Sequence, residues 1–457
     1  MMTKTPRHMA VEILNRVEEE GAYAEPLLDV SLSGHPQIKL QDKKLITEIV
    51  YGTLRMRGNL DWVIERIYRG KFNNLDVSIR NILRTALYQL LFTERIPAFA
   101  IVDEAVEMTK KVSRAGSGLV NAILRNFIRK QDQIAYPEIR KEPAHHISVV
   151  HSHPLWLVRK WIEIFGVDET VALCKANNQV PPVTVRVNTL KTTREKTKKG
   201  LSRQGFEVKE TIFSPDGLII SSSPTSARET TFYTSGDIHF QDEASQLAAR
   251  LVSPRPGENV LDICAGMGGK TTHLAALMDN DGSILALDIS KKKIDALCKN
   301  ASRLNATIVD AQVGDARKEP RKAFPGTFDR ILVDAPCTGL GTLRRNPEIK
   351  WRARPEDAER CAILQKAILE QAAACLKNGG YLVYSTCTIT KEENEGVIKD
   401  FTDRHPDFIC NRPPDAINSS LVDADGYFRS YPHRHGTDGF YGAILVKGHV
   451  GMKIQND

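Results

Sequence analysis

The stretch Asn259–Thr271, NVLDICAGMGGKT, combines an apolar strand, a glycine-rich turn and the start of a helix. Glycines permit a tight turn and a close approach of the backbone to a ligand, and the first turn of a helix presents free N–H groups. The stretch therefore predicts a strand, turn and helix with a ligand at the turn. A dinucleotide site or a plain tight connection fits equally well. A Walker-type phosphate loop is excluded, because the stretch lacks the spacing G-x-x-x-x-G-K-[ST].

Beyond Phe240 the same pattern recurs. Apolar strands, each followed by a polar or glycine-bearing turn, alternate with helix-like segments in SILALDIS, ATIVDAQVGD, FDRILVDAPC and YLVYSTCT. This alternation predicts a parallel α/β sheet, and such sheets bind ligands beyond the carboxyl ends of their strands. The predicted strand ends carry Asp288, Asp315, Asp334, Cys337 and Cys387.

Acids at successive strand ends favour an adenosyl ligand. Asp288 follows the glycine turn by about twenty residues, where a carboxylate accepts hydrogen bonds from ribose hydroxyls. Asp315 ends the next strand, where its carboxylate could accept a hydrogen bond from an adenine amino group. Taken singly, each acid is explained equally well by the capping of a helix.

The first part of the chain is expected to be helical. Apolar residues recur at intervals of three and four, as in one buried face of an amphipathic helix, at Ile79, Ile82, Leu83, Ala86, Leu87, Leu90 and Leu91. A similar pattern from Leu119 to Ile128 completes an all-α domain that ends near Gln133. Its polar faces carry basic residues, which fit either a solvated helix face or an RNA-binding patch: Lys110, Lys111, Arg114, Arg125, Arg129 and Lys130.

The segment AYPEIRKEPAHHISVVHSHP, residues 135–154, has no helical period and is expected to be a linker. Its histidines have no cysteine or carboxylate at ligand spacing, which disfavours a metal site. From Pro154 a helical segment is predicted, and the alternation of Val183, Val185 and Val187 predicts a strand. This middle part, to about Gly236, is expected to be a small α+β unit.

Composition narrows the possible partners. The chain has 457 residues, and 63 Lys plus Arg exceed 56 Asp plus Glu, so its net charge of +7 favours an anionic partner such as nucleic acid. A signal peptide and a stretch of eighteen or more apolar residues are both missing from the sequence, so we expect a cytoplasmic protein without membrane contact. The eight cysteines form no C-x-x-C pair, which argues against a zinc site and a disulfide framework.

A set of motifs resembles the RNA cytosine-5 methyltransferases. They are RVNTLK, FQDEASQ, CAGMGGKT, GDA at Asp315, DAPCTGLGTLRRNPEIKWR, YSTCTITKEENE and HRHGTDGFYGA. The resemblance covers about Thr184 to Lys447, and the helical part resembles a NusB-like RNA-binding domain. This pairing is similar to that of the bacterial enzymes that methylate C5 of cytosine in 16S ribosomal RNA.

The resemblance implies a multidomain protein. We expect an all-α NusB-like domain over residues 1–144, a linker with a small α+β subdomain over 145–236, and a Rossmann-like methyltransferase domain over 237–457. The implied cofactor is S-adenosylmethionine. The implied partner is 16S ribosomal RNA, naked or in a small-subunit precursor, and the protein is expected to be a monomer that uses no metal.

The resemblance also implies which residues bind the cofactor. They follow the first strand or end the later ones: Cys264, Ala265, Gly266, Met267, Gly268, Gly269, Lys270, Asp288, Asp315 and Asp334. The chain departs from the family pattern at Gly266-Met267, where Ala-Pro is usual, so the turn should be less rigid. Tyr441 replaces a usual Phe.

Two cysteines suit methylation of C5, which is too weak a nucleophile to attack a methyl sulfonium unaided. A thiolate that adds to C6 makes C5 reactive, and after methyl transfer the C5 proton must leave before the thiol is expelled. By chemistry alone, either Cys337 or Cys387 could attack. The resemblance implies that Cys387 is the nucleophile and Cys337 the assistant, that Asp334 contacts the N3–N4 edge of cytosine, and that Lys270 adds positive potential. An ordinary turn carboxylate and a solvated lysine are the alternatives for the last two.

The segment RRNPEIKWR is expected to contact RNA phosphates and to stack on a base through Arg344, Arg345, Lys350, Trp351 and Arg352. An RNA-binding assembly or antitermination protein with an inactive methyltransferase half is the alternative from another class. The presence of both cysteines and all three cofactor acids argues against it. YSTCT and the NusB-like part disfavour a DNA cytosine methyltransferase.

Overall fold

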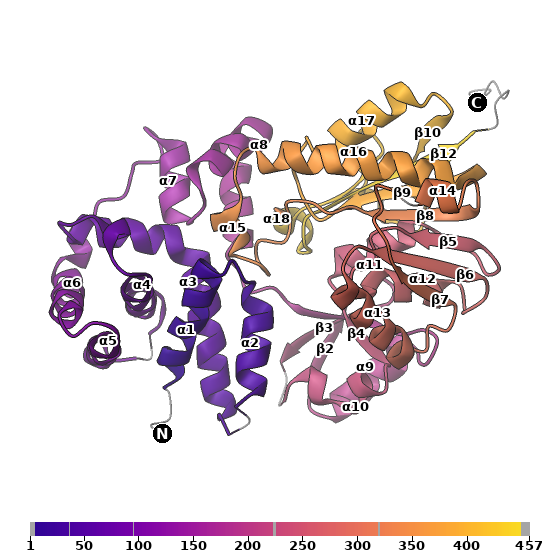
Figure 1. The fold of residues 1–457 in the computed structure, drawn as a ribbon. Coiled ribbons are helices and arrows are strands. Elements are labelled where there is room, and N and C mark those ends of the chain that lie inside the picture. Colours follow the sequence, from indigo (N-terminus) through magenta and orange to yellow (C-terminus); the bar gives the residue numbers. More distant parts are fainter. Residues whose placement is uncertain (1–4, 36, 95, 223–224, 319, 449–457) are drawn as a thin grey trace. The chain divides into compact units, whose positions relative to one another are not determined.

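The computed structural model describes residues 5–35, 37–94, 96–222, 225–318 and 320–448. By its internal contacts the chain divides into two compact units (Figure 1). Unit 1 comprises Met1–Val180 together with Leu343–Ala353, and unit 2 comprises Pro181–Thr342 together with Arg354–Asp457. Within the described ranges no helix is long and apolar enough to cross a membrane. The expected domain boundaries near residues 144 and 236 remain predictions.

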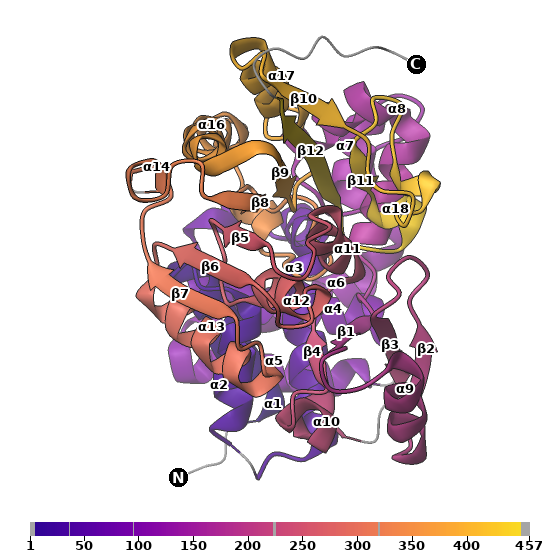
Figure 2. The same ribbon diagram turned by 90° about the vertical axis from the view of Figure 1, so that its right-hand side faces the viewer.

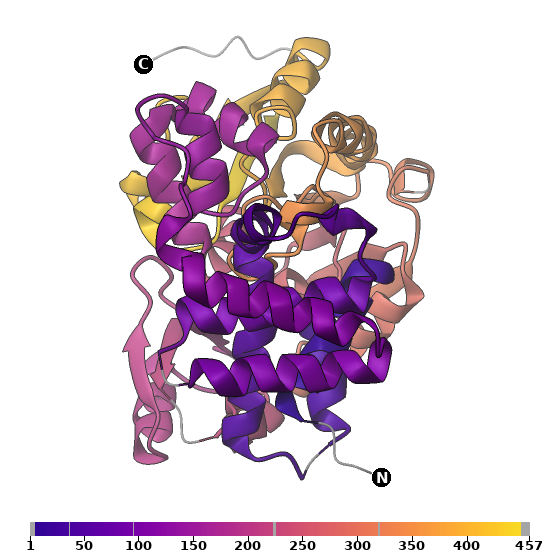
Figure 3. The same cartoon turned by 90° about the vertical axis from the view of Figure 1, so that its left-hand side faces the viewer.

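The first part of unit 1 is helical, as predicted (Figure 3). The elements are α1 (Pro6–Glu19), α2 (Ala24–Ser33), α3 (Leu40–Ile67), η1 (Phe72–Asn74), α4 (Val77–Phe92), α5 (Ala98–Val112), α6 (Gly116–Lys130) and η2 (Gln131–Gln133). Helix α4 shows why these segments fold: the side chain of Asp76 accepts a hydrogen bond from Ser78 N, and the apolar stripe that includes Leu83 and Leu87 is fully buried.

The predicted linker was wrong in part, because it contains helix α7 (Pro143–Val150). Pro143 stands in the first turn, where its missing N–H is not needed, and Ile147 and Val149 are buried. The helix packs against α8 (Leu155–Asn177) and is too short to reveal a period in the sequence. Helix α8 confirms the predicted helical segment, with a break at Gly166, whose φ is +79°.

A distant stretch of chain, Leu343–Ala353, completes unit 1 and contains α15 (Ile349–Arg352). The ammonium of Lys350 is fully buried and donates to Arg55 O (2.9 Å), Ser152 O (3.0 Å) and Asn178 Oδ1 (2.9 Å). Trp351 Nε1 donates to Leu54 O (2.7 Å).

Burial contradicts the expected RNA contact for Arg344 and Lys350, and the contact stays a prediction for the half-exposed Arg345, Trp351 and Arg352. Arg344 and Lys350 are buried, Trp351 donates its N–H within unit 1, and Arg352 donates to the carbonyl groups of Val17 and Ala22. The charged groups of Lys350 and Arg352 donate hydrogen bonds to backbone oxygens inside unit 1.

Unit 2 begins with a small antiparallel sheet whose strand order is β2-β3-β1-β4. Its elements are β1 (Val183–Val187), α9 (Arg194–Arg203), β2 (Glu207–Glu210), β3 (Gly217–Ser222), η3 (Ala227–Glu229), α10 (Thr231–Thr234) and β4 (Ile238–Phe240). Val185 and Val187 belong to a core with Leu201 and Leu218, which confirms the predicted strand. The predicted half-buried alternation was wrong, because Val183 is exposed and Thr184 and Arg186 are buried.

The larger sheet has the order β10-β12-β9-β8-β5-β6-β7, and β11 pairs with β12 (Figure 2). Its strands are β5 (Asn259–Asp262), β6 (Ser283–Asp288), β7 (Val309–Val313), β8 (Phe328–Asp334), β9 (Leu376–Thr386), β10 (Phe408–Asn411), β11 (Phe428–Ser430) and β12 (Phe440–Lys447). Strands β5 to β9 are parallel, as predicted, and β12 joins β9 in the antiparallel direction.

Helices cover both faces of this sheet (Figure 2). They are α11 (Glu243–Leu251), α12 (Gly269–Leu277), α13 (Lys291–Leu304), α14 (Pro320–Ala323), α16 (Asp357–Cys375) and α17 (Glu395–Arg404), with η4 (Ser419–Leu421) and α18 (Pro432–His435) in later loops. One apolar core joins the strands to α16 and α17, and the other joins them to α11, α12 and α13. Burial on both faces explains why the central strands β8 and β9 have long apolar runs, whereas the edge strand β7 is more polar and largely exposed.

Candidate active site

The parallel pair β8–β9 brings the two candidate cysteines together. Asp334 lies opposite Ser385 in the register, so the chain turns into a loop at the same level after both strands. Cys337 and Cys387 stand in these loops, and their Sγ atoms are 3.2 Å apart. Both residues are half-buried. The distance confirms that neighbouring strands place the two thiols side by side.

Close backbone contacts fix the two loops. Gly341 N donates to Cys387 O (3.0 Å), and Gly439 N donates to Gly341 O (2.8 Å). A Cβ at Gly341 would lie 2.0 Å from Gly439 O and 2.8 Å from Cys387 O. A side chain cannot be accommodated there, so glycine permits the approach that sets the position of Cys387.

Lys270 and Asp334 form an ion pair beside the thiols. Lys270 Nζ lies 2.6 Å from Asp334 Oδ2, and Ser385 Oγ donates to Asp334 Oδ1 (3.0 Å). Burial by itself lowers the pKa of Lys270, but the Asp334 carboxylate outweighs it and the net pKa is raised, with a further contribution from Cys387. Lys270 therefore carries a positive charge near Cys387.

Cys337 lies in a different electrostatic environment. Its pKa is raised well above the usual range, first by its hydrogen bond with Cys387, then by burial and by the charges of Cys387 and Glu393. At neutral pH Cys337 is a protonated thiol. The two sulfur atoms are neighbours, yet the positive charge of Lys270 acts on Cys387 and the negative charge of Glu393 acts on Cys337.

Glu393 was not assigned a role from the sequence, although it lies within the quoted motif YSTCTITKEENE. Its carboxylate is fully buried and accepts hydrogen bonds from Thr338 N (2.8 Å), Thr338 Oγ1 (2.6 Å), Thr390 Oγ1 (2.7 Å) and Gln365 Nε2 (3.2 Å). Acids in a polar run are usually exposed, so the sequence carries little signal for this burial.

The glycine turn leaves room for a ligand. Gly266 has φ +58° and Gly268 φ +85°, and a Cβ at Gly268 would lie 2.7 Å from Leu297 Cγ. A Cβ at Gly266 would meet nothing within 4 Å, and Met267 is 63% exposed. Cys264 and Ala265 precede the turn, and Gly269 begins α12. Backbone groups on the open edge of the turn can therefore be reached by a ligand.

Asp288 supports the same turn from the end of β6. Its carboxylate accepts from Gly266 N (3.0 Å) and Ser290 N (2.8 Å), and Lys293 Nζ lies 3.6 Å away. Asp315 is held by Arg317, which donates to both carboxylate oxygens (2.9 and 2.7 Å) and lowers the pKa of Asp315 to about 2. Burial raises the pKa of Asp262 to about 7, although Thr271 Oγ1 donates to it.

The motifs RVNTLK and FQDEASQ support the turn from outside. The guanidinium of Arg186, in β1, is buried and donates to Gly269 O (2.6 Å), Thr272 Oγ1 (3.0 Å) and Gln241 Oε1 (2.5 Å). Burial lowers the pKa of Arg186 to about 9. Arg186 thus connects the small sheet to the first turn of α12, a role that its position in a strand did not reveal.

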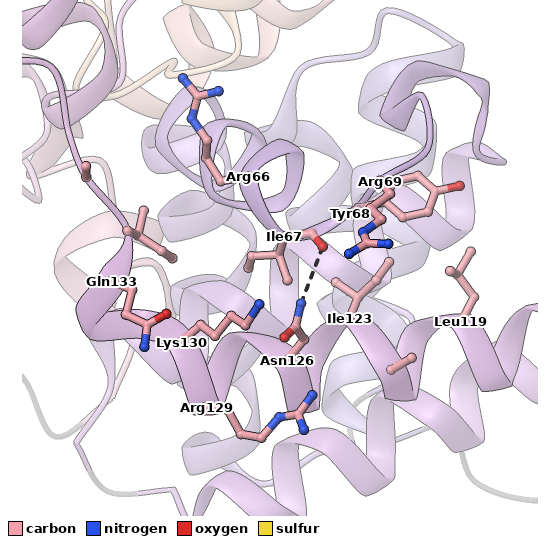
Figure 4. Close-up of a pocket in the computed structure, with 13 residues that line it drawn as sticks. Arg66, Ile67, Tyr68, Arg69, Leu119, Ile123, Asn126, Arg129, Lys130 and Gln133 are labelled. Atoms are coloured by element: carbon pink, nitrogen blue, oxygen red, sulfur yellow. Dashed lines mark hydrogen bonds between the residues drawn. The ribbon is translucent and has the colours of Figure 1, made fainter.

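Unit 1 contains a hollow of about 730 Å³ between the end of α3 and helix α6. The side chains that line it are drawn in Figure 4. Its lining includes four basic residues, Arg66, Arg69, Arg129 and Lys130. The guanidinium carbon of Arg66 lies 3.9 Å from the centroid of the Trp62 ring. None of the described lining residues is acidic, and in the described ranges none of these four cations has an acidic partner. Arg129 and Lys130 of the expected basic patch thus belong to this hollow.

Other expected charges are used differently. Arg125 donates to Asn121 Oδ1 (2.9 Å), and Lys110 pairs with Glu107. Among the described residues, no group of three or more His, Cys, Asp or Glu side chains could hold a metal ion.

Family models match most of the chain. The model of the 16S rRNA methyltransferase RsmB/F family matches residues 249–446, the NusB family model residues 4–129, and the ferredoxin-like domain model of RsmF/B-like methyltransferases residues 153–226. The probable ribosomal RNA small subunit methyltransferase B of Bacillus subtilis is 36% identical over 447 residues, which cover 96% of this chain and 98% of that protein. The chain belongs to the RsmB/F methyltransferase family.

Solved structures support the same assignment. The structure of PH0851 is 31% identical, covers 98% of this chain and 100% of its own, and has a TM-score of 0.82. NSun6 from Pyrococcus horikoshii, solved with SFG, is 26% identical over 64% of this chain and 97% of its own, with a TM-score of 0.57. The expected family, the NusB-like helical domain, the small middle domain and the α/β methyltransferase domain are confirmed, and the chain is an RNA methyltransferase.

Proposed function

We propose that the chain methylates C5 of a specific cytosine in 16S ribosomal RNA through a covalent bond between Cys387 Sγ and C6. The observation that carries the proposal is the pair of thiols 3.2 Å apart, with the Lys270–Asp334 pair beside them. Bound S-adenosylmethionine would supply the methyl group as an electrophile, and its sulfur would leave as a neutral thioether when the methyl–sulfur bond breaks. The relatives named for methylation of small-subunit ribosomal RNA support the substrate class.

The chemistry follows from the positions of the side chains. The Cys387 thiolate adds to C6 and the C5=C6 double bond opens, so that C5 can form its bond to the methyl carbon. Loss of the C5 proton to a base then restores C5=C6 and expels the Cys387 thiolate. Lys270 places a positive charge near the sulfur of Cys387, and Asp334 can accept a hydrogen bond from the amino group of cytosine.

Cys337 is suited to the second half of this reaction. The main cause of its high pKa is the sulfur of Cys387, and this sulfur becomes an uncharged thioether in the adduct. Cys337 can then lose its proton more easily and accept the C5 proton. This order of events supports the proposal that Cys387 attacks and that Cys337 assists release.

Bisulfite mapping of 16S ribosomal RNA from cells with and without the gene tests the activity. We expect one protected cytosine to lose protection without the gene and to regain it with the wild-type gene but not with Cys387→Ala. An RNA-binding protein with an inactive methyltransferase half would leave the two maps identical.

For the cofactor, we propose the turn Cys264–Lys270 with Asp288, Asp315 and Asp334. Asp288→Ala is expected to weaken S-adenosylmethionine binding by about 1–3 kcal/mol, because it removes the ribose acceptor and two hydrogen bonds that hold the turn. Isothermal titration calorimetry measures the change. Asp288→Asn, which keeps one acceptor oxygen, should lose less, and the exposed Asp310→Ala should match the wild type. Unchanged affinity in Asp288→Ala would remove this residue from the site.

For the RNA, we propose that the hollow of unit 1 binds phosphates of a single-stranded segment. The four cations supply charge, and the apolar side chains of Ile67 and Ile123 beside them suit a base.

The double variant Arg69→Ala/Arg129→Ala is expected to weaken RNA binding. It should also reduce the magnitude of the slope of log binding constant against log salt concentration by about 1–2, because fewer counterions are released when fewer phosphates are contacted. Fluorescence anisotropy with a 16S ribosomal RNA fragment at several salt concentrations measures both. Arg16→Ala is the matched control, because Arg16 already pairs with Glu20. Cofactor affinity should not change, and an unaltered salt slope would contradict the assignment.

A further inference from the structure

A buried carboxylate connects the two cysteine loops. Glu393 accepts two hydrogen bonds from Thr338, the neighbour of Cys337, and one from Thr390 in the loop that follows Cys387. Thr338 Oγ1 and Thr388 Oγ1 are also 2.9 Å apart. The Glu393 backbone is fixed as well, because Tyr384 OH donates to its carbonyl oxygen (2.6 Å). A single side chain therefore holds both loops in their relative positions.

The charge of Glu393 is compensated by neutral donors only. Its partners are a backbone N–H, two hydroxyl groups and an amide, and within the described residues no lysine or arginine pairs with it. The lysine of the site, Lys270, is instead paired with Asp334. The field of this buried negative charge therefore acts on Cys337, whose thiolate it disfavours.

We propose that Glu393 is the positioning residue that separates the roles of the two thiols: it links the Cys337 loop to the loop that follows Cys387 and holds Cys337 beside a buried carboxylate, so that Cys387 attacks. This inference rests on the proposed covalent mechanism. It explains why two equivalent nucleophiles 3.2 Å apart do not compete for C6. Cys337 takes part only after the sulfur of Cys387 has formed its bond to C6.

The test is the pH dependence of alkylation of Cys337 by iodoacetamide in the full-length Cys387→Ala protein, followed by mass spectrometry of the peptide. The double variant Cys387→Ala/Glu393→Gln lacks the charge of Glu393, so the midpoint pH of Cys337 alkylation is expected to fall by about one unit. Glu393→Asp, which keeps the charge, should leave it high. Thr390→Val is the matched control, because it removes one hydrogen bond to the same carboxylate and retains the charge, so its midpoint should not move.

An equal midpoint in Glu393→Gln and Thr390→Val would overturn the proposal. Should Glu393→Gln fail to fold, the Cys387→Ala protein alone still allows the proposal to be refuted: burial and Glu393 both act to raise the pKa of Cys337, so a midpoint at or below the value of about 8.5 for a free cysteine would contradict the role of Glu393. No RNA or cofactor enters this assay. A failure of the covalent mechanism would show instead as the absence of any RNA–protein adduct.

Discussion

Replacement of Cys387 by alanine is expected to abolish methyl transfer and to prevent any covalent RNA–protein complex. Without addition to C6, C5 remains unreactive towards the methyl group. Cys337 is not expected to substitute, because its proposed role is to accept the C5 proton, and burial and Glu393 still raise its pKa when the sulfur of Cys387 is removed. Transfer of a radiolabelled methyl group to 16S ribosomal RNA and denaturing gel electrophoresis measure the two effects. Cys298→Ala, which removes an exposed thiol, is the control and should behave as the wild type.

The complementary variant has the opposite signature. Cys337→Ala retains the attacking thiol, so the RNA should be methylated but released slowly, and an adduct that survives denaturing conditions should accumulate. The double variant should form no adduct, since accumulation requires attack by Cys387. An adduct in Cys387→Ala that is missing in Cys337→Ala would reverse the two roles.

The second large effect is expected in unit 1, at Lys350. Lys350→Ala removes the donor of three hydrogen bonds in a fully buried site, and leaves Arg55 O, Ser152 O and Asn178 Oδ1 without it. Unsatisfied buried acceptors and the empty volume should lower the free energy of unfolding by about 3–5 kcal/mol. Urea unfolding of the full chain, followed by circular dichroism, measures it. Lys291→Ala, at an exposed i,i+4 pair with Asp295, should cost at most about 0.5 kcal/mol.

The same site gives a pH dependence. Burial lowers the pKa of Lys350 to about 7, below the value of about 10.4 in an unfolded chain. Between these values the unfolded state binds more protons, so the contribution of Lys350 to stability increases as the pH rises from about 7 to about 10. In Lys350→Met this contribution is missing, and the stability difference from the wild type should grow over that range. A difference that is independent of pH would show that the ammonium stays charged in the folded state.

These contacts also limit the use of truncation. The stretch Leu343–Ala353 directly follows the Cys337 loop in sequence but belongs to unit 1. Removal of residues 1–144 would take away Leu54 and Arg55, which accept hydrogen bonds from Trp351 and Lys350. Loss of RNA binding in such a truncated protein would not separate RNA contacts from damage to this segment, whereas Arg69→Ala/Arg129→Ala does.

The sequence by itself determined the parallel α/β sheet, the helical first domain, the glycine turn and the meeting of Cys337 with Cys387. These features depend on local patterns: strands buried on both faces are apolar throughout, helices repeat every three to four residues, and strand ends collect at one edge. Such rules need only near neighbours in the chain. The motifs then added the family.

Only the tertiary structure decided which charged residues are buried and what they contact. Glu393, Arg186 and Lys350 stand in polar runs or an ordinary strand, and their partners lie far away in sequence, as Arg55 does for Lys350. A buried charge is stable only when distant donors or acceptors converge on it, and no local pattern records that convergence. The segment Leu343–Ala353 was misread in part for this reason: Lys350 and Arg352 resemble a phosphate-binding surface, yet they donate to carbonyl oxygens inside unit 1.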